Sequence, residues 1–188
     1  MTTISTSAEP KHALNDALVL YGATGDLAYK KIFPALHALV RQGRNDLPII
    51  GVALSGWTLE RLRERVRESL QQHSLGDDAA ATRLCELLRY VDGDYRDAST
   101  FQQIERALGT ARQPLHYLAI PPSLFATVVE HIATLKSTPA ARVVVEKPFG
   151  RDLASAQTLN RTLHQVFDER AIFRIDHYLG KEPVQNLL

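Results

Sequence analysis

Strand-length apolar runs alternate with stretches of helical periodicity along this 188-residue chain. Four of these runs have the length and composition of β-strands: Ala17–Tyr21, Leu47–Ala53, Leu115–Ile120 and Arg142–Glu146. Strands that alternate with helices form a parallel sheet, because each crossover returns the chain to the same edge. Three consecutive valines, at 143–145, fit a strand that is covered on both faces. The sequence therefore predicts an α/β fold with a doubly wound, mostly parallel sheet and helices on both faces.

The segments between these runs carry apolar side chains every three or four residues, which places them on one face of a helix. A further helix is expected over Ala79–Leu88, followed by a turn at 92–94. The apolar stripes that we assign to helices are Ile32, Leu36, Leu39 and Val40; Leu59, Leu62, Val66 and Leu70; Leu124, Val128 and Ile132; and Leu153, Ala156, Leu159, Leu163 and Val166.

Composition excludes several classes of protein. A formal net charge of +1 gives no large field that favours nucleic acid or a membrane surface. No apolar run reaches the roughly 18 residues that a membrane-spanning helix needs. The single cysteine, Cys85, can form neither an internal disulfide nor a cysteine metal site, which fits the reducing cytoplasm. We therefore expect a cytoplasmic protein without metal, in which residues 1–14 form a disordered leader and residues 15–188 form one domain.

A glycine-rich turn follows the first predicted strand and precedes a predicted helix. Its sequence is Gly22-Ala23-Thr24-Gly25-Asp26-Leu27-Ala28, with the spacing G-x-x-G-x-x-A. Glycine lets a ligand approach the backbone, and the free N–H groups and dipole of a helix N-terminus favour a phosphate. The position of the turn predicts a Rossmann-like dinucleotide-binding site, and a strand-to-helix turn without a ligand is the alternative.

The end of the second predicted strand is where such folds select the adenosine ribose of the cofactor. The sequence there is Ile50-Gly51-Val52-Ala53-Leu54-Ser55. It offers no acidic residue for a ribose 2′-OH, which argues against NAD, and no arginine for a 2′-phosphate. Ser55, Lys30 and Lys31 are the polar candidates for this contact.

Two charged residues, Glu146 and Lys147, lie at the end of the fourth predicted strand, before Pro148. Ligands of doubly wound sheets bind at the carboxyl ends of the strands. Lys147 is therefore expected in the crevice that holds the reactive end of a cofactor. A solvated pair with Glu146 is the alternative interpretation.

Hydrogen-bonding and titratable groups are dense in the segment Arg174–Glu182. A lysine, a histidine and a tyrosine close together (Lys181, His177 and Tyr178) suit a phosphate monoester. Asp176 can orient a histidine from another part of a site, as a carboxylate does when it fixes an imidazole tautomer. A surface turn is the alternative. The remaining histidines are interpreted as ordinary surface residues: His12, His37, His73, His116, His131 and His164.

Together these segments resemble glucose-6-phosphate dehydrogenases, over roughly residues 17–188. The resemblance implies an N-terminal Rossmann-like domain and oxidation of glucose 6-phosphate to 6-phosphoglucono-1,5-lactone, with transfer of a hydride from C1 to NADP, in the pentose phosphate pathway. The matching segments are Gly22–Ala28, Leu118–Pro122, Glu146–Gly150 and Arg174–Glu182, of which the last two are long and unusual.

The resemblance also implies roles for individual residues. Tyr117 is expected along the cofactor, and Lys147 against both the cofactor and the sugar. Asp176 is expected to orient the general base. The residues expected to hold the pyrophosphate are Gly22, Ala23, Thr24, Gly25, Asp26 and Leu27, and those expected to bind the substrate phosphate are His177, Tyr178 and Lys181.

The sequence departs from the family pattern in two respects. The family's general base is a histidine of a larger C-terminal domain, which also makes the homo-oligomer contacts, and no histidine here matches it. We therefore expect a chain truncated before that domain, with little or no turnover of its own. Leu54 stands where the family commonly has an arginine for the NADP 2′-phosphate, and Tyr29 where it has a lysine, so NAD is the alternative cofactor.

Two other functions compete with this interpretation. An unrelated reductase of the short-chain class needs a Tyr-x-x-x-Lys pair on a helix, but Tyr178 and Lys181 have the wrong spacing and Tyr117 lies in a predicted strand. A catalytically inactive NAD(P)-binding module is the other alternative. Such a module would associate through the apolar surface that the missing domain leaves exposed.

Overall fold

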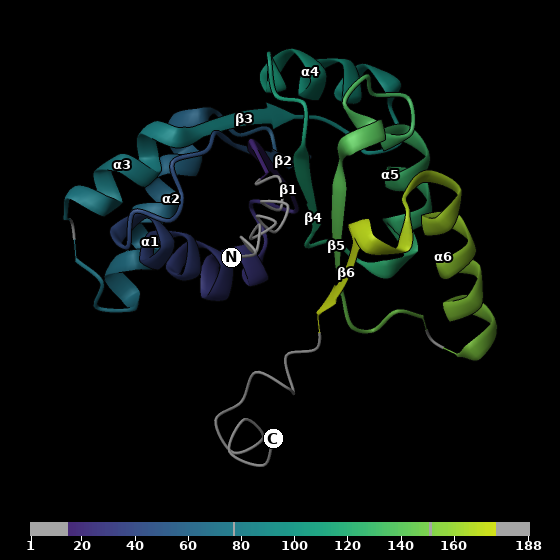
Figure 1. Ribbon diagram of the computed structural model, residues 1–188. Coiled ribbons are helices and arrows are strands. Elements are labelled where there is room, and N and C mark those ends of the chain that lie inside the picture. Colours follow the sequence, from purple (N-terminus) through teal and green to yellow (C-terminus); the bar gives the residue numbers. More distant parts are fainter. Residues whose placement is uncertain (1–14, 77, 151, 176–188) are drawn as a thin grey trace, which may run out of the picture.

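The computed structural model describes residues 15–76, 78–150 and 152–175 (Figure 1). The expected leader, residues 1–14, lies outside the described residues. Strands and helices alternate as the sequence predicts. The strands are β1 (Ala17–Tyr21), β2 (Ile49–Ala53), β3 (Leu88–Asp92), β4 (Pro114–Leu118), β5 (Arg142–Glu146) and β6 (Ile172–Ile175). The main helices are α1 (Phe33–Arg41), α2 (Leu59–Gln72), α3 (Ala79–Leu87), α4 (Ala98–Leu108), α5 (Phe125–Ile132) and α6 (Leu153–Val166).

Short helical segments connect several of these elements. The chain enters α1 through a segment of π-helical geometry, η1 (Ala28–Ile32), directly after the glycine loop. Three single 3₁₀ turns complete the described structure: η2 (Pro122–Leu124), η3 (Thr138–Ala140) and η4 (Glu169–Ala171).

The strands form one sheet in the order β3-β2-β1-β4-β5-β6, and every neighbouring pair is parallel. The order runs one way from β1 to β3 and the other way from β4 to β6, so it reverses between β1 and β4. In doubly wound sheets a ligand binds outside the carboxyl ends of the strands at this switch point. The predicted Rossmann-like α/β fold is therefore confirmed, and it concentrates the strand-end loops at one edge.

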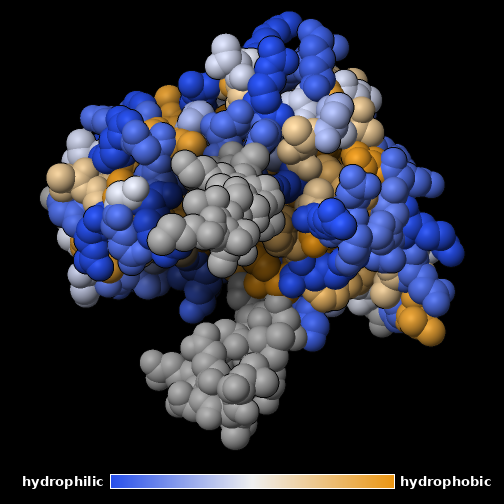
Figure 2. All heavy atoms as spheres, viewed as in Figure 1, coloured by the Kyte–Doolittle hydropathy of each residue, from blue (hydrophilic) through white to orange (hydrophobic). Residues whose placement is uncertain are grey.

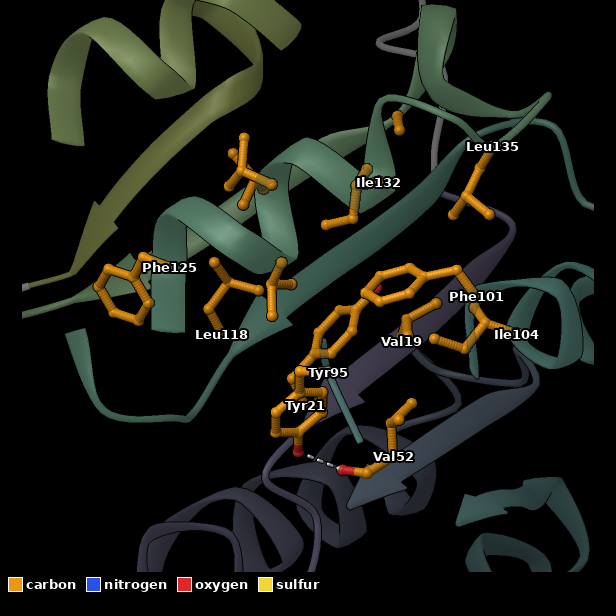
Figure 3. Close-up of a cluster of buried hydrophobic side chains, with 14 of the residues drawn as sticks. Val19, Tyr21, Val52, Tyr95, Phe101, Ile104, Leu118, Phe125, Ile132 and Leu135 are labelled. Atoms are coloured by element: carbon orange, nitrogen blue, oxygen red, sulfur yellow. Dashed lines mark hydrogen bonds between the residues drawn. The ribbon is translucent and has the colours of Figure 1, made fainter. Parts of the chain in front are cut away.

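Alternate residues of the central strand β1 contribute to two separate cores. Leu18 and Leu20 pack with residues of α1, α2 and α3. Val19 and Tyr21 pack with residues of α4, α5 and α6 (Figures 1 and 3). Because both faces of β1 and β2 are covered, every residue of these two strands is buried.

The outer strands are less covered. In β4, buried and half-buried residues alternate, and in β6 Phe173 and Arg174 are exposed. Figure 2 shows hydrophilic residues over most of the visible face, with hydrophobic residues scattered among them. The sheet is therefore most completely covered at β1 and β2, where the glycine loop begins.

Two strands were not predicted. The sequence predicted a helix up to Leu88 and only a turn at 92–94, whereas β3 occupies Leu88–Asp92 as one of the two outermost strands of the sheet. β6 occupies the other edge, at the start of the Arg174–Glu182 segment. β3 buries only two of its five residues, and β6 is only four residues long and contains Arg174, so neither shows the longer apolar run by which the inner strands are recognised.

The interpretation of His37 and His116 as surface residues was wrong, because both are completely buried. His37 Nε2 lies 2.9 Å from Asp78 Oδ1 at the start of α3. His116 lies in β4, where its Nδ1 is 3.1 Å from the Tyr21 hydroxyl of β1. Burial lowers the pKa of His116 to about 3, so this imidazole is neutral in the folded protein.

A close backbone approach shapes the turn after β1. Gly22 has a φ of +81°, a left-handed conformation that favours glycine. A Cβ at this position would lie 2.1 Å from the carbonyl oxygen of Ala119, which follows β4. Gly43 also has a positive φ, of +66°, but a Cβ there meets nothing within 4 Å.

These two glycines separate backbone strain from steric overlap. Gly43→Ala should lower the free energy of unfolding by about 1 kcal/mol, the cost of a left-handed alanine. Gly22→Ala should lower it by about 3 kcal/mol, because the backbone at Ala119 must also move. Urea denaturation of both variants measures the difference, and equal losses would contradict the close approach.

The buried imidazole gives the protein a pH-dependent stability. An unfolded histidine has a pKa of about 6.5, and His116 has a pKa of about 3 when folded. Between these values only the unfolded state binds the proton, so the free energy of unfolding falls as the pH falls, by about 1.4 kcal/mol per pH unit.

Denaturation between pH 6 and pH 4.5 tests this on the wild type and on His116→Asn. The asparagine retains an acceptor for Tyr21 but does not titrate. The slope of unfolding free energy against pH should be shallower in the variant, whatever its absolute stability. Parallel slopes would show that His116 takes up its proton without unfolding.

Candidate functional site

The loops that follow β1, β4 and β5 lie side by side at the carboxyl edge of the sheet. β4 pairs with both β1 and β5, which places its end between theirs. The N–H of Ala119 donates to Tyr21 O at 3.0 Å, which joins the chain after β4 to the end of β1. This edge brings together the glycine loop, the Ala119–Pro122 segment and Lys147.

Several backbone groups of the glycine loop hold the loop itself. The N–H of Gly22 lies 2.8 Å from the Tyr95 hydroxyl and 2.9 Å from Val52 O. The N–H of Ala23 also donates to Val52 O, at 3.3 Å, and that of Gly25 donates to Gly22 O at 2.9 Å. Ala23 is completely buried. These three of the predicted cofactor residues therefore fix the shape of the loop.

Other N–H groups of the loop suit a phosphate. The helix makes its first backbone bond from Tyr29 N–H to Gly25 O, at 3.1 Å. The N–H groups of Asp26 and Leu27 precede that bond, as in the first turn of any helix. No backbone bond in the described part of the loop uses the Thr24 N–H. Together with the space that Gly22 leaves, these groups fit a pyrophosphate at a helix N-terminus.

Two cations balance the carboxylate of Asp26. Lys30 Nζ lies 2.8 Å from Asp26 Oδ2, and Arg65 Nη2 of α2 lies 3.9 Å from Asp26 Oδ1. The hydrogen bond from Lys30, followed by its charge, lowers the pKa of Asp26. The Arg65 guanidinium also lies 4.1 Å above the ring of Tyr29. The loop therefore lies at a helix N-terminus whose one carboxylate, Asp26, is balanced by the positive charges of Lys30 and Arg65.

Tyr95, which no sequence pattern predicted as a site residue, contacts the glycine loop through its hydroxyl. It follows β3, is 9% exposed and donates from its hydroxyl to Val52 O at 2.9 Å (Figure 3). Its ring packs edge-on against Tyr21, with centroids 5.9 Å apart. Burial raises the pKa of Tyr95 to about 12, which keeps this donor protonated. No local motif marks Tyr95, because its partners are 43 and 73 residues away.

Tyr117 and Glu146 are joined across the ends of β4 and β5. The Tyr117 hydroxyl donates to Glu146 Oε1, and Glu146 is only 7% exposed. Burial, followed by this hydrogen bond and the charge of Glu146, raises the pKa of Tyr117. The phenol is therefore held in its neutral form, directly beside the strand end that carries Lys147.

Lys147 is exposed at the carboxyl end of β5, and its peptide bond to Pro148 is cis. Its backbone N–H donates to Ile175 O at 3.3 Å. Ile175 ends β6 and precedes the predicted phosphate-binding cluster. Lys147 thus lies beside the strand from which that cluster continues, but the cluster itself lies outside the described residues: Asp176, His177, Tyr178 and Lys181.

A cavity of about 330 Å³ lies beside these loops. Its lining comes from residues 121–123 after β4, residues 148–150 after β5, and the side of α6 with Ser155 and Leu159. Most of the lining is apolar proline, phenylalanine and leucine. The carboxyl edge therefore has a hollow next to Lys147 as well as an anion-binding turn.

No group of three or more histidine, cysteine or acidic side chains is placed to hold a metal ion in the part of the chain that the structure describes. Within residues 15–76, 78–150 and 152–175, no helix has the length and apolar character that crossing a membrane requires.

Comparison with known proteins identifies relatives of this fold. A family model described as glucose-6-phosphate dehydrogenase, NAD binding domain, matches residues 19–186. Glucose-6-phosphate 1-dehydrogenase 1 of Mycobacterium bovis is 45% identical over 173 residues, which are 92% of this chain and 37% of that protein. The crystal structure of glucose-6-phosphate 1-dehydrogenase from Mycobacterium avium matches with a TM-score of 0.84 and 45% identity, over 93% of this chain and 39% of that one.

A second solved structure is a glucose-6-phosphate dehydrogenase in complex with its substrate glucose-6-phosphate. It has a TM-score of 0.80 and 40% identity, over 93% of this chain and 39% of that one. The chain spans less than two fifths of the length of these relatives in each case. The family match, which covers the glycine loop and all six strands except the first two residues of β1, shows that the chain belongs to the glucose-6-phosphate dehydrogenase family and corresponds to its NAD-binding domain.

Proposed function

We propose that the chain is the NAD(P)-binding part of an enzyme that oxidises glucose 6-phosphate to 6-phosphoglucono-1,5-lactone, in the pentose phosphate pathway. One observation carries the proposal: the glycine loop and Lys147 lie at the same edge of the sheet, on either side of the loop that follows β4. A relative of the same fold has been solved with glucose-6-phosphate as its substrate. The bound cofactor supplies the acceptor for the hydride that leaves C1 of the sugar.

We assign the pyrophosphate contact to the backbone N–H groups of Thr24, Asp26 and Leu27. Gly22 keeps the approach open, and Ala23 and Gly25 maintain the turn. Tyr117, anchored by Glu146, lies beside the path of the cofactor. The family pattern favours NADP, and NAD is the alternative because Leu54 replaces the usual arginine.

Lys147 is assigned to contact both the cofactor and the sugar, since it is exposed at the end of β5. Asp176 is assigned to orient the general base. The dianion of the substrate phosphate suits the grouping of a lysine, an imidazole and a phenol. The residues assigned to this phosphate are His177, Tyr178 and Lys181.

The base itself has no counterpart among the seven histidines of this sequence. We infer that residues 15–188 act as a cofactor domain with half of the sugar site, and that homo-oligomer contacts of the whole enzyme lie elsewhere. Removal of the C1 hydroxyl proton strengthens hydride donation, so a site without a base has a higher barrier. We place the protein in the cytoplasm, which suits a chain whose one cysteine cannot form an internal disulfide. We propose neither nucleic acid nor membrane as a partner, because a formal net charge of +1 gives no large field that favours them.

Thr24→Glu tests the cofactor site. The new carboxylate lies beside the assigned pyrophosphate and repels it, so the Kd for NADP should rise at least about tenfold, which is about 1.4 kcal/mol. Isothermal titration calorimetry on the 188-residue chain measures this. Thr110→Glu is the matched control. Thr110 is exposed in the loop that precedes β4, at the amino ends of the strands and therefore away from the glycine loop. Equal weakening by both variants, or by neither, would remove the glycine loop from the binding site.

A turnover measurement tests the proposal that the general base is not among the residues of this chain. The 188-residue chain, supplied with glucose 6-phosphate and either dinucleotide, should show a kcat/KM at least about a hundredfold below that of a full-length relative. Ultraviolet absorbance of the reduced nicotinamide is the measurement. A rate closer to that of the relative would mean that these residues contain a working base.

A further inference from the structure

The turn after β2 is closed by a carboxylate from the neighbouring strand. Asp92 Oδ1 accepts hydrogen bonds from the N–H of Ser55 at 3.0 Å and from the N–H of Gly56 at 2.9 Å. The Tyr90 hydroxyl lies 2.9 Å from the same oxygen and 2.8 Å from Ser55 Oγ. Gly56 has a φ of +66°, a left-handed conformation that favours glycine in this turn.

Converging backbone N–H groups of this kind form a concavity that binds anions. Here the protein's own carboxylate occupies it. The N–H of Ser55, followed by the Tyr90 hydroxyl and the N–H groups of Gly56 and Trp57, lowers the pKa of Asp92. Asp92 therefore stays ionised at neutral pH, and the donors that could receive a second anion are already used.

This carboxylate lies at the adenosine end of the dinucleotide cleft. In a doubly wound fold the residues after the second strand contact the adenosine ribose. Asp92 is paired in register with Ala53, the last residue of β2, and the N–H of Gly93 donates to Ala53 O at 2.9 Å. The fixed negative charge is thus beside the position that a ribose 2′-phosphate takes.

No cation of the turn balances Asp92. Leu54, at the position of the usual arginine, is 63% exposed and apolar. The nearest cation of α2 along the chain, Arg61, binds Glu64 at 2.9 Å and Glu68 at 3.2 Å. Its guanidinium also lies 5.3 Å from the centre of the Trp57 ring.

Two of the cations near the glycine loop are engaged as well. Lys30 and Arg65 both face Asp26, at 2.8 and 3.9 Å. Arg61, Lys30 and Arg65 therefore already face other carboxylates. The hydrogen bonds that Asp92 accepts in the described β2 turn come from neutral donors.

We propose that Asp92 determines cofactor specificity by repelling a ribose 2′-phosphate, so that the chain selects NAD over NADP. This rests on the proposed function, since it presupposes that a dinucleotide binds along the carboxyl edge. A 2′-phosphate adds close to two negative charges opposite a fixed carboxylate. NAD, which has a neutral 2′-hydroxyl, avoids that repulsion and can donate a hydrogen bond to the second oxygen of Asp92.

Equilibrium binding to the 188-residue chain tests the proposal without requiring turnover. Isothermal titration calorimetry should give a Kd for NAD at least about tenfold lower than that for NADP. Raising the ionic strength from about 0.05 to about 0.5 M should narrow this ratio, because salt screens repulsion between partly exposed charges. The same pair of titrations with 5′-ADP and 2′,5′-ADP isolates the adenosine end.

Asp92→Asn removes the charge but keeps an oxygen for Ser55 and Gly56. It should lower the Kd for NADP about tenfold and change that for NAD by less than about threefold. Asp94→Asn is the matched control, because Asp94 lies two residues on and pairs with Arg96 at 2.7 Å. Thermal unfolding of each variant confirms that it is folded.

The outcomes separate the two proposals. If neither dinucleotide binds, the proposed function is wrong, and the proposed role of Asp92 in cofactor specificity is wrong as well. If both bind but NADP binds as tightly as NAD, or if Asp92→Asn and Asp94→Asn shift the ratio equally, the cofactor site stands and the role of Asp92 is wrong. If the ratio of the Kd values for NAD and NADP does not change with ionic strength, repulsion between Asp92 and the 2′-phosphate is not the cause of the selectivity.

Discussion

The backbone at Gly22 and the carbonyl of Ala119 approach so closely that no side chain fits between them. This contact lies where β1 and β4 diverge, at the switch point of the sheet, and it sets how the glycine loop leaves β1. Tyr95 fixes the other side of the loop through Gly22 and Val52. With its route determined on both sides, the chain can direct the N–H groups of the following helix outward, toward a ligand rather than into the fold.

Parallel topology explains why residues far apart in the chain share this edge. Each crossover returns the chain to the same side of the sheet, so the ends of β1, β4, β5 and β6 accumulate there. Backbone bonds then join neighbouring ends: Ala119 to Tyr21, and Lys147 to Ile175. The glycine loop and Lys147 are 125 positions apart in sequence, yet only the β4 strand separates the strands that carry them.

The sequence predicted what depends on local patterns. The bounds of β1, β5 and α6 follow directly from their apolar runs and helical period. The two edge strands were not recognised, because β3 buries only two of its five residues and β6 is only four residues long and contains Arg174. His116 was misread for a related reason: its burial depends on Tyr21, 95 residues away, and a single histidine in a strand gives no sign of that partner. Within the site, the glycine loop and Lys147 were predictable as motifs, whereas Tyr95 and Asp92 act only through contacts across strands.

The two carboxylates at the carboxyl ends of the strands, Asp26 and Asp92, differ in the groups that face them. Cations face Asp26, whereas neutral donors hold Asp92. Asp26 faces Lys30 and Arg65, so the helix N-terminus can receive a pyrophosphate without a net repulsion. Asp92 accepts hydrogen bonds from neutral N–H and hydroxyl donors, which stabilise its charge without neutralising it. Leucine at position 54 adds no compensating charge. In the binding mode that we propose, the same edge would attract phosphate at the centre of the sheet and repel it at the adenosine end.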